Sequence, residues 1–95
     1  MTNENTNSIF VGDKPFMNYV TAVVMQLTTQ NADEVIIKAR GKFISKAVDI
    51  TEVAKNRFLE NQVEVSEIKI DSEDFKNKEG KEIRVSTIEI TLKKK

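Results

Sequence analysis

The chain has 95 residues, of which 15 are acidic and 15 basic, so its formal net charge is zero. That balance argues against a strong general nucleic-acid binder, and the absence of His and Cys excludes imidazole bases, thiolate nucleophiles and disulfides. No apolar run approaches the roughly 20 residues that span a bilayer, and the start lacks a signal-peptide pattern. A cytoplasmic protein without membrane contact is expected.

The first half of the chain predicts a strand, a helix and a second strand. Residues 1–7 are polar and predict a disordered tail, and one domain is expected over residues 8–95. Residues 9–11 predict a short strand, and Pro15, with Asp13 as a candidate cap, predicts a helix start. An apolar stripe at helical spacing follows, made of Phe16, Val20, Val23, Val24 and Leu27. Apolar residues 35–37 predict a buried strand.

The second half predicts a helix and two strands. An amphipathic helix is expected from about residue 43 to 59. Alternating apolar residues predict strands over 63–70 and 88–92, with a turn at 77–80. The expected fold class is therefore α+β: a single compact domain in which two helices pack on a four-stranded mixed sheet.

The last hairpin is unusually polar. Residues 71–84 hold only Phe75 and Ile83 as large apolar groups, so this part is expected to project into solvent as an arm. Phe75 would then either stack on a base or cover the root of the hairpin. The apolar parity switches at residues 66–67 and 86–87, which predicts a bulge or a change of face in both strands.

Residues 38–46 carry the clearest functional signal. Gly41 lies at their centre, where a strand gives way to a helix, and no acid interrupts four cations: Lys38, Arg40, Lys42 and Lys46. Cations at such a junction can meet one phosphate backbone together with helix N-terminal amides. The segment therefore predicts a nucleic-acid contact surface, with an ordinary solvated loop as the alternative.

Catalysis and metal binding are not expected. A nucleotide-hydrolase phosphate loop needs Gly at position 36 and Ser or Thr at position 43, where this chain has Ile36 and Phe43. The acids of residues 71–74 lack the spacing of a calcium loop. We expect no enzyme activity, no cofactor and no metal site.

Four blocks of the sequence resemble the archaeal Alba chromatin proteins. They are residues 12–20, 37–49, 56–59 and 84–90, in order and at matching spacing. The resemblance implies a homodimeric nucleoid protein that associates with the chromosome and binds double-stranded DNA, and in many members RNA. It also implies that the polar hairpin reaches along the minor groove.

The resemblance carries roles to particular positions. It would place Lys14, Arg40 and Lys42 at the DNA backbone, with Asn18 and Tyr19 in the same motif as Lys14. The basic segment itself adds Gly41 and Lys46 to the predicted contacts of the body. The arm would add Lys76, Lys78, Lys81 and Arg84. Phe58 matches an aromatic position that the family uses for contact between dimers on DNA. Core packing is the alternative for both Phe58 and Tyr19.

One departure from the family pattern bears on binding strength. The family turn usually reads Gly-Lys-Lys-Pro, whereas this chain has Asp13 between Gly12 and Lys14. Because the arm is acidic as well, binding weaker or more selective than that of typical basic members is expected. An RNA-binding module acting on structured RNA is the alternative function, and an assembly domain that binds no nucleic acid is a third.

Overall fold

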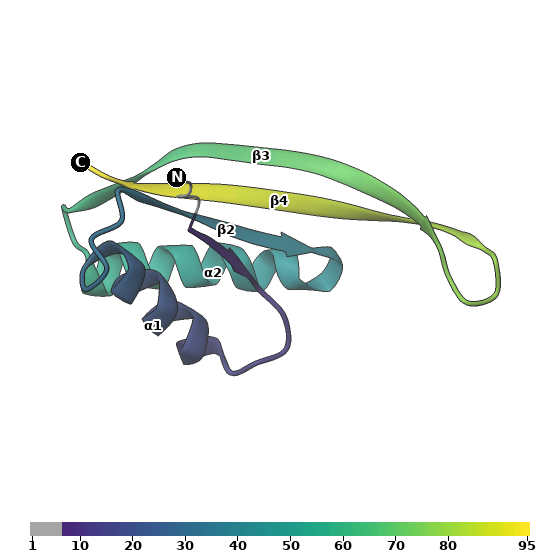
Figure 1. Ribbon diagram of the computed structural model, residues 1–95, viewed down its shortest axis with the longest axis horizontal. Helices are drawn as coiled ribbons and strands as arrows, with labels where there is room; N and C mark the ends of the chain where they lie inside the picture. Colours follow the sequence, from purple (N-terminus) through teal and green to yellow (C-terminus); the bar gives the residue numbers. More distant parts are fainter. Residues whose placement is uncertain (1–6) are drawn as a thin grey trace.

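The computed structural model describes residues 7–95. Two helices cover one face of a four-stranded sheet, and two strands run on beyond the helices as a hairpin (Figure 1). In chain order the elements are β1 (Ser8–Phe10), α1 (Phe16–Leu27), β2 (Glu34–Arg40), α2 (Ile44–Val53), β3 (Val63–Lys76) and β4 (Glu82–Lys94). The predicted α+β architecture is confirmed.

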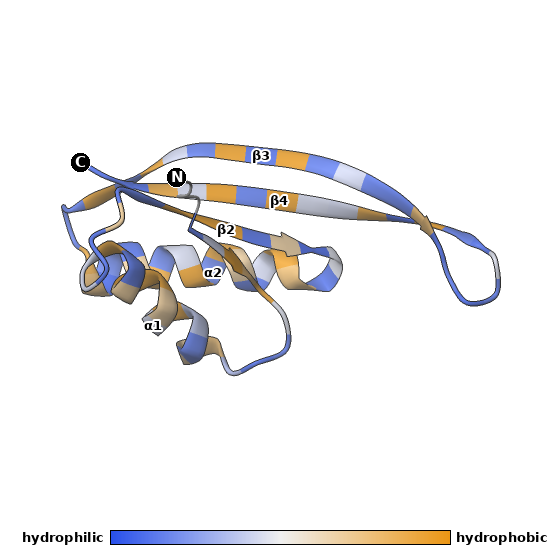
Figure 2. Cartoon of the chain, viewed as in Figure 1, coloured by the Kyte–Doolittle hydropathy of each residue, from blue (hydrophilic) through white to orange (hydrophobic). Residues whose placement is uncertain are grey.

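The strands lie in the order β1-β2-β4-β3. β1 is parallel to β2, and the other neighbours are antiparallel. β2 pairs with β4 only as far as the contact between Arg40 and Thr87. Past that point β4 has β3 as its sole neighbour in the described sheet, and this two-stranded part is the predicted arm. Hydrophilic residues dominate its tip (Figure 2).

The core lies between the helices and the sheet. Helix α1 buries most of its predicted stripe, including Val20, Val23 and Leu27. Alternation along β2 buries Val35, Ile37 and Ala39 on the helix side and turns Lys38 and Arg40 to the other side, called the open face below. β4 contributes to the same core with Ile88, Ile90 and Leu92.

Several predicted boundaries shift. β1 begins and ends one residue earlier than expected, and β2 runs three residues further, to Arg40, because residues 38–40 pair with β4. Residues 38–40 of the basic segment, with two of its four cations, are therefore strand. The second helix is one helical run over residues 41–58, with a 3-10 turn before α2 and a π-turn after it. Among the described residues no side chain caps α1, so the prediction that Asp13 does was wrong.

The two parity switches have different origins. The register of β3 against β4 shifts between Val65 and Glu67, which confirms a bulge there. β4 passes Ser86 and Thr87 in unbroken register, so its apolar residues change face without a bulge.

The predicted N-terminal tail is described only at its last residue. Of the predicted tail, Asn7 belongs to the sheet edge, since its carbonyl accepts a hydrogen bond from the Ile36 N–H at 2.8 Å. The rest of that prediction lies outside the described residues.

Among residues 7–95, no helix is both long and apolar enough to cross a membrane.

Candidate nucleic-acid interface

The loop between β1 and α1 is held by two side chains from the helices. The hydroxyl of buried Tyr19 accepts hydrogen bonds from the backbone N–H groups of Gly12 (2.9 Å) and Lys14 (3.2 Å). The ammonium of Lys46 on α2 donates to the carbonyls of Gly12 (2.7 Å) and Lys14 (2.6 Å). The same ammonium lies 5.0 Å from the centroid of the Tyr19 ring. Tyr19 and Lys46 thus fix the position of the loop.

Both residues were predicted to touch nucleic acid, and the structure gives each of them partners within the chain. Tyr19 is 7% exposed, in line with the core alternative, and Lys46 is half-buried. The local sequence around Lys46 gives no hint of its role, because Lys46 and Gly12 are 34 residues apart. The two side chains act on the surface by holding the loop that carries Asp13 and Lys14.

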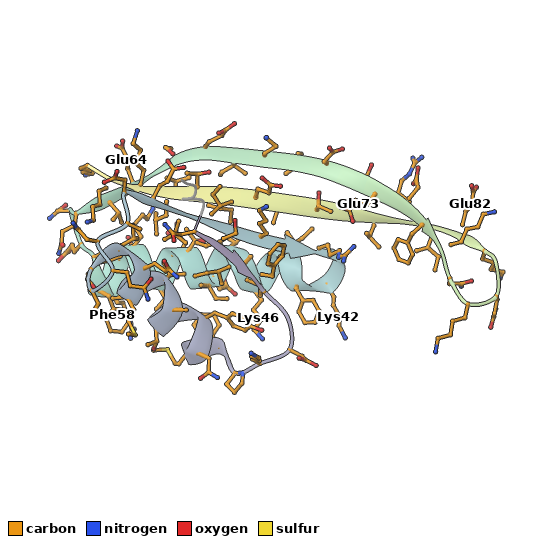
Figure 3. All side chains as sticks on the ribbon, viewed as in Figure 1. Lys42, Lys46, Phe58, Glu64, Glu73 and Glu82 are labelled. Carbon is orange, nitrogen blue, oxygen red and sulfur yellow. The ribbon has the colours of Figure 1, made fainter. Side chains whose placement is uncertain are left out.

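Lys14 and Lys42 are exposed cations of the body, and neither forms an ion pair among the described residues. Lys42 follows Gly41, whose φ of +59° lies in the left-handed region that favours glycine and lets β2 turn directly into the helical run. Figure 3 shows Lys42 at the end of the helical layer nearest the arm, with Lys46 further along the same layer. Asn18 is also exposed, on the first turn of α1. We call Lys14, Lys42 and the loop of residues 12–15 the basic end.

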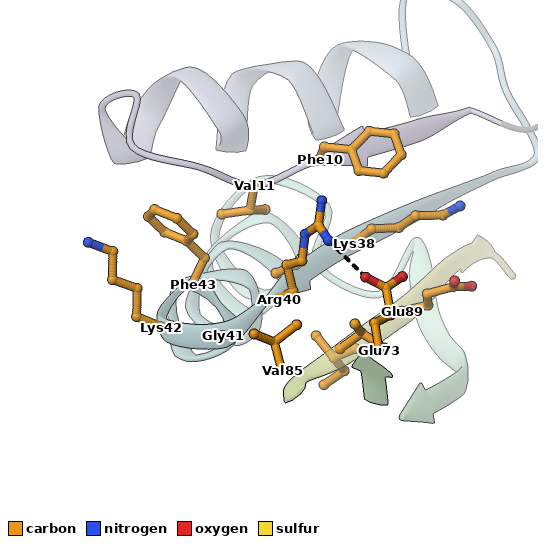
Figure 4. Close-up of a pocket in the computed structure, with 13 residues that line it drawn as sticks. Phe10, Val11, Lys38, Arg40, Gly41, Lys42, Phe43, Glu73, Val85 and Glu89 are labelled. Carbon is orange, nitrogen blue, oxygen red and sulfur yellow. Dashed lines mark hydrogen bonds and ion pairs between the residues drawn. The ribbon is translucent and has the colours of Figure 1, made fainter. Parts of the chain in front are cut away.

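Arg40 is engaged with the arm. Its Nη1 donates to Glu73 Oε1 at 2.8 Å, linking the end of β2 to β3 (Figure 4). Their side chains are 64% and 55% exposed, so the pair contributes about 1 kcal/mol or less. A phosphate can therefore compete with Glu73 for the guanidinium.

The arm pairs a second arginine with its own acid. Arg84 and Asp74 are opposite each other in the hairpin, with Nε to Oδ1 at 2.8 Å and Nη2 to Oδ2 at 3.5 Å. Among the described residues, no ion pair involves the three arm lysines Lys76, Lys78 and Lys81. These lysines are the arm's available cations.

The arm is organised by residues that the sequence interpretation passed over. At the tip, the side-chain oxygen of Asn77 accepts hydrogen bonds from the N–H groups of Glu79 (2.9 Å) and Lys81 (3.0 Å). An Asn before a glycine turn is the signal that could have indicated this cap. Phe75 lies opposite Ile83 near the tip, far from the root of the hairpin that it was predicted to cover, and 45% of it is exposed. Its other predicted role, stacking on a base, stays a prediction.

The open face of the sheet does not suit a duplex. The strand register places six acids and four cations on this face. The acids are Glu34, Glu64, Glu67, Asp71, Glu73 and Glu89, and the cations are Lys38, Arg40, Lys69 and Lys93. The excess of carboxylates repels a phosphate backbone along most of this face. Within residues 7–95, no three or more carboxylates are grouped to hold a metal ion.

Phe58 lies at the opposite end of the helical layer from Lys42 (Figure 3). It ends the π-turn of residues Ala54–Phe58, and 49% of the side chain is exposed. The next residue, Leu59, is buried instead. The exposed half of the Phe58 ring is available to another molecule.

These features define a class of small α+β domain: a parallel β1–β2 pair, two helices on one sheet face, a basic end and a projecting hairpin. The Alba family model matches residues 7–72. The chain belongs to the Alba family.

The relatives are similar over most of their length. DNA/RNA-binding protein Alba of Methanococcus maripaludis is 49% identical over 86 residues, covering 90% of this chain and 96% of the relative. The structure of Alba from Thermoplasma volcanium superposes with a TM-score of 0.84 at 50% identity, covering 92% of this chain and 99% of the other. The structure of ALBA1 from Trypanosoma brucei superposes with a TM-score of 0.71 at 26% identity. The match covers 97% of this chain and 72% of the other. Membership of this family confirms that the chain is not an enzyme.

Proposed function

We propose that this chain is a chromosomal protein that binds double-stranded DNA as a homodimer, through the phosphate backbone and the minor groove. One observation carries the proposal: Tyr19 and Lys46 hold the loop that presents exposed Lys14. The ammonium groups of Lys46 and exposed Lys42 both lie beside the Phe43 ring, at 5.9 and 5.4 Å from its centroid. A cation on an anchored loop loses less conformational entropy when it meets a phosphate. The Methanococcus relative, named as a DNA/RNA-binding protein, supports nucleic acid as the ligand.

The arm supplies the second contact. It is a two-stranded ribbon with Lys76, Lys78 and Lys81 near its tip. A narrow ribbon carrying lysines fits beside the phosphates that border a minor groove, where contacts depend on the width of the groove more than on sequence. The body and the arm would then hold neighbouring stretches of one duplex.

Charge pairing within the chain supports weak or selective binding. Arg40 and Arg84 are each bound to a carboxylate, and Asp13 stands beside Lys14. Lys46 is hydrogen-bonded to backbone carbonyls. Of the cations predicted for the body, Lys14 and Lys42 therefore provide most of the immediate attraction for phosphate.

An apolar strip beside the edge strand supports homodimerisation. Ile68 and Ile70 of β3 are 60% and 76% exposed, although they share the helix-side face with buried Ile90 and Ile88. Ile44 of α2 lines a shallow groove together with Ile70, and exposed Val48 lies one helical turn further. A second copy would cover this strip and bring two basic ends to one duplex. Phe58, far from the strip's Ile44 end, would then contact a neighbouring dimer.

Fluorescence anisotropy with matched duplex DNA and duplex RNA, at several salt concentrations, tests the proposal. Binding to DNA that weakens steeply with salt is the expected result. A clear preference for duplex RNA would favour the alternative, a module for structured RNA, which the name of the Methanococcus relative also accommodates. Absence of binding to either duplex would refute the proposed function and favour an assembly domain over a module for structured duplex RNA.

A further inference from the structure

A cavity of about 510 Å³ opens at the corner of the open face next to the end of β2 (Figure 4). Its walls come from five elements, namely β1, β2, the turn into α2, β3 and β4. The residues that matter most are Phe10, Lys38, Arg40, Phe43, Glu73 and Val85. The volume lies within the range of pockets that bind small organic ligands, about 300–1,000 Å³.

Phe10 is the most unusual residue of this cavity. It is 72% exposed on a strand whose neighbours Ile9 and Val11 contribute to the core. The ammonium of Lys38, its partner in the parallel pair, lies 5.3 Å from the ring centroid. An exposed aromatic ring beside a lysine offers a surface on which a base can stack and a charge that can meet the phosphate of the same nucleotide.

The polar groups of the cavity match the remaining parts of a nucleotide. The guanidinium of Arg40 is planar and can bind phosphate or stack on a base. The carboxylates of Glu73 and Glu89 are acceptors for the amino groups on base edges. Val85 and Phe43 add apolar surface. At this corner Lys38, Arg40 and Lys42 outnumber the two acids, unlike the rest of the open face.

We infer that this cavity binds an unpaired nucleotide of single-stranded nucleic acid, with its base stacked on Phe10. A duplex cannot fill the site, because its bases are stacked on one another and their faces are hidden. The inference goes beyond the duplex contact proposed above, since the two surfaces use different residues apart from Lys42 and Arg40. Either can fail without the other.

The first test replaces Phe10 and measures anisotropy with labelled single strands of about 12 nucleotides, one DNA and one RNA, and with the matching blunt DNA duplex. Phe10→Ala should weaken single-strand binding by about 5- to 100-fold and leave duplex binding unchanged. Met25→Ala, which removes another exposed apolar side chain, is the matched control and should change neither. Equal affinity of wild type and Phe10→Ala for both single strands would overturn the inference.

The second test uses Phe10→Trp, which keeps a stacking ring and creates the only tryptophan of the chain. Its fluorescence should be quenched by the single strand and not by the duplex. The DNA and RNA strands decide which nucleic acid is the source of the nucleotide. Unquenched fluorescence at saturating single strand, or equal quenching by the duplex, would contradict the stacked base. Single-strand binding without any duplex binding would refute the proposed function and leave this inference standing.

Discussion

The basic end and the arm hold their cations in opposite ways. At the basic end, Lys46 is bonded to two backbone carbonyls, and the loop that it fixes presents Lys14 to solvent. In the arm, Arg84 is bound to a carboxylate on the facing strand, and Glu73 also holds Arg40 of the body. The basic end therefore presents the charge of Lys14 at a fixed position. Arg40 and Arg84, by contrast, can bind a phosphate only if it displaces Glu73 or Asp74.

Because of this difference, we expect Lys14 and Lys42 to govern the affinity for a duplex, and Arg40 to govern the selectivity between nucleic acids. A phosphate reaching Lys14 or Lys42 displaces no ion pair of the described structure. A phosphate reaching Arg40 must first replace Glu73, at a cost of about 1 kcal/mol or less. Under the proposed function, nucleic acids whose shape brings phosphates close to both regions would recover that cost, and others would not.

The largest effect is expected from breaking the anchor of the loop. Tyr19→Phe removes the acceptor of the Gly12 and Lys14 N–H groups, and each unsatisfied group costs about 1–3 kcal/mol where water cannot replace it. Urea unfolding should show the loss of stability, and duplex affinity should fall as well.

Lys42→Ala is the matched control for that experiment. Lys42 is exposed and forms no ion pair among the described residues, so its replacement should weaken duplex binding without lowering the free energy of unfolding. Full stability of Tyr19→Phe would show that the loop is not held in the way described here.

Restoring a lysine at the turn should strengthen the basic end. Asp13→Lys removes one repulsive charge and adds one attractive charge per subunit beside Lys14. A hydrogen bond between charged groups contributes about 1.5–3 kcal/mol, so duplex affinity should rise about tenfold or more. Anisotropy should also give a steeper salt dependence. Unchanged affinity would mean that Asp13 faces away from the bound duplex.

A smaller gain is expected from releasing the arginine held by the arm. Glu73→Gln should free Arg40 and raise duplex affinity by up to about fivefold per subunit, the equivalent of an exposed ion pair. Thermal unfolding should change little. Asp74→Asn, which frees Arg84 further along the arm, is the comparison variant. A loss of affinity in Glu73→Gln would show that the pair positions Arg40 for binding rather than competing with phosphate.

Local patterns in the sequence were enough to predict the fold class and to locate the exposed cations. The stripe of α1 and the polar composition of the arm follow from neighbouring residues, so both could be predicted. The partners of Lys46 and Arg40 could not, because they lie 32 to 34 residues away and meet only after the sheet has formed. Spacing alone cannot distinguish a lysine that binds phosphate from one that binds a carbonyl.

Under the proposed function, Lys14 and Lys42 at the basic end bind the phosphates of a duplex. The most direct test of this claim is the slope of log affinity against log salt for duplex DNA, measured by anisotropy for the wild type and for the double variant Lys14→Gln, Lys42→Gln. Each lost phosphate contact should make the slope shallower by about 0.9, hence by about 1.8 per subunit for the double variant. A slope unchanged from the wild type would contradict the account.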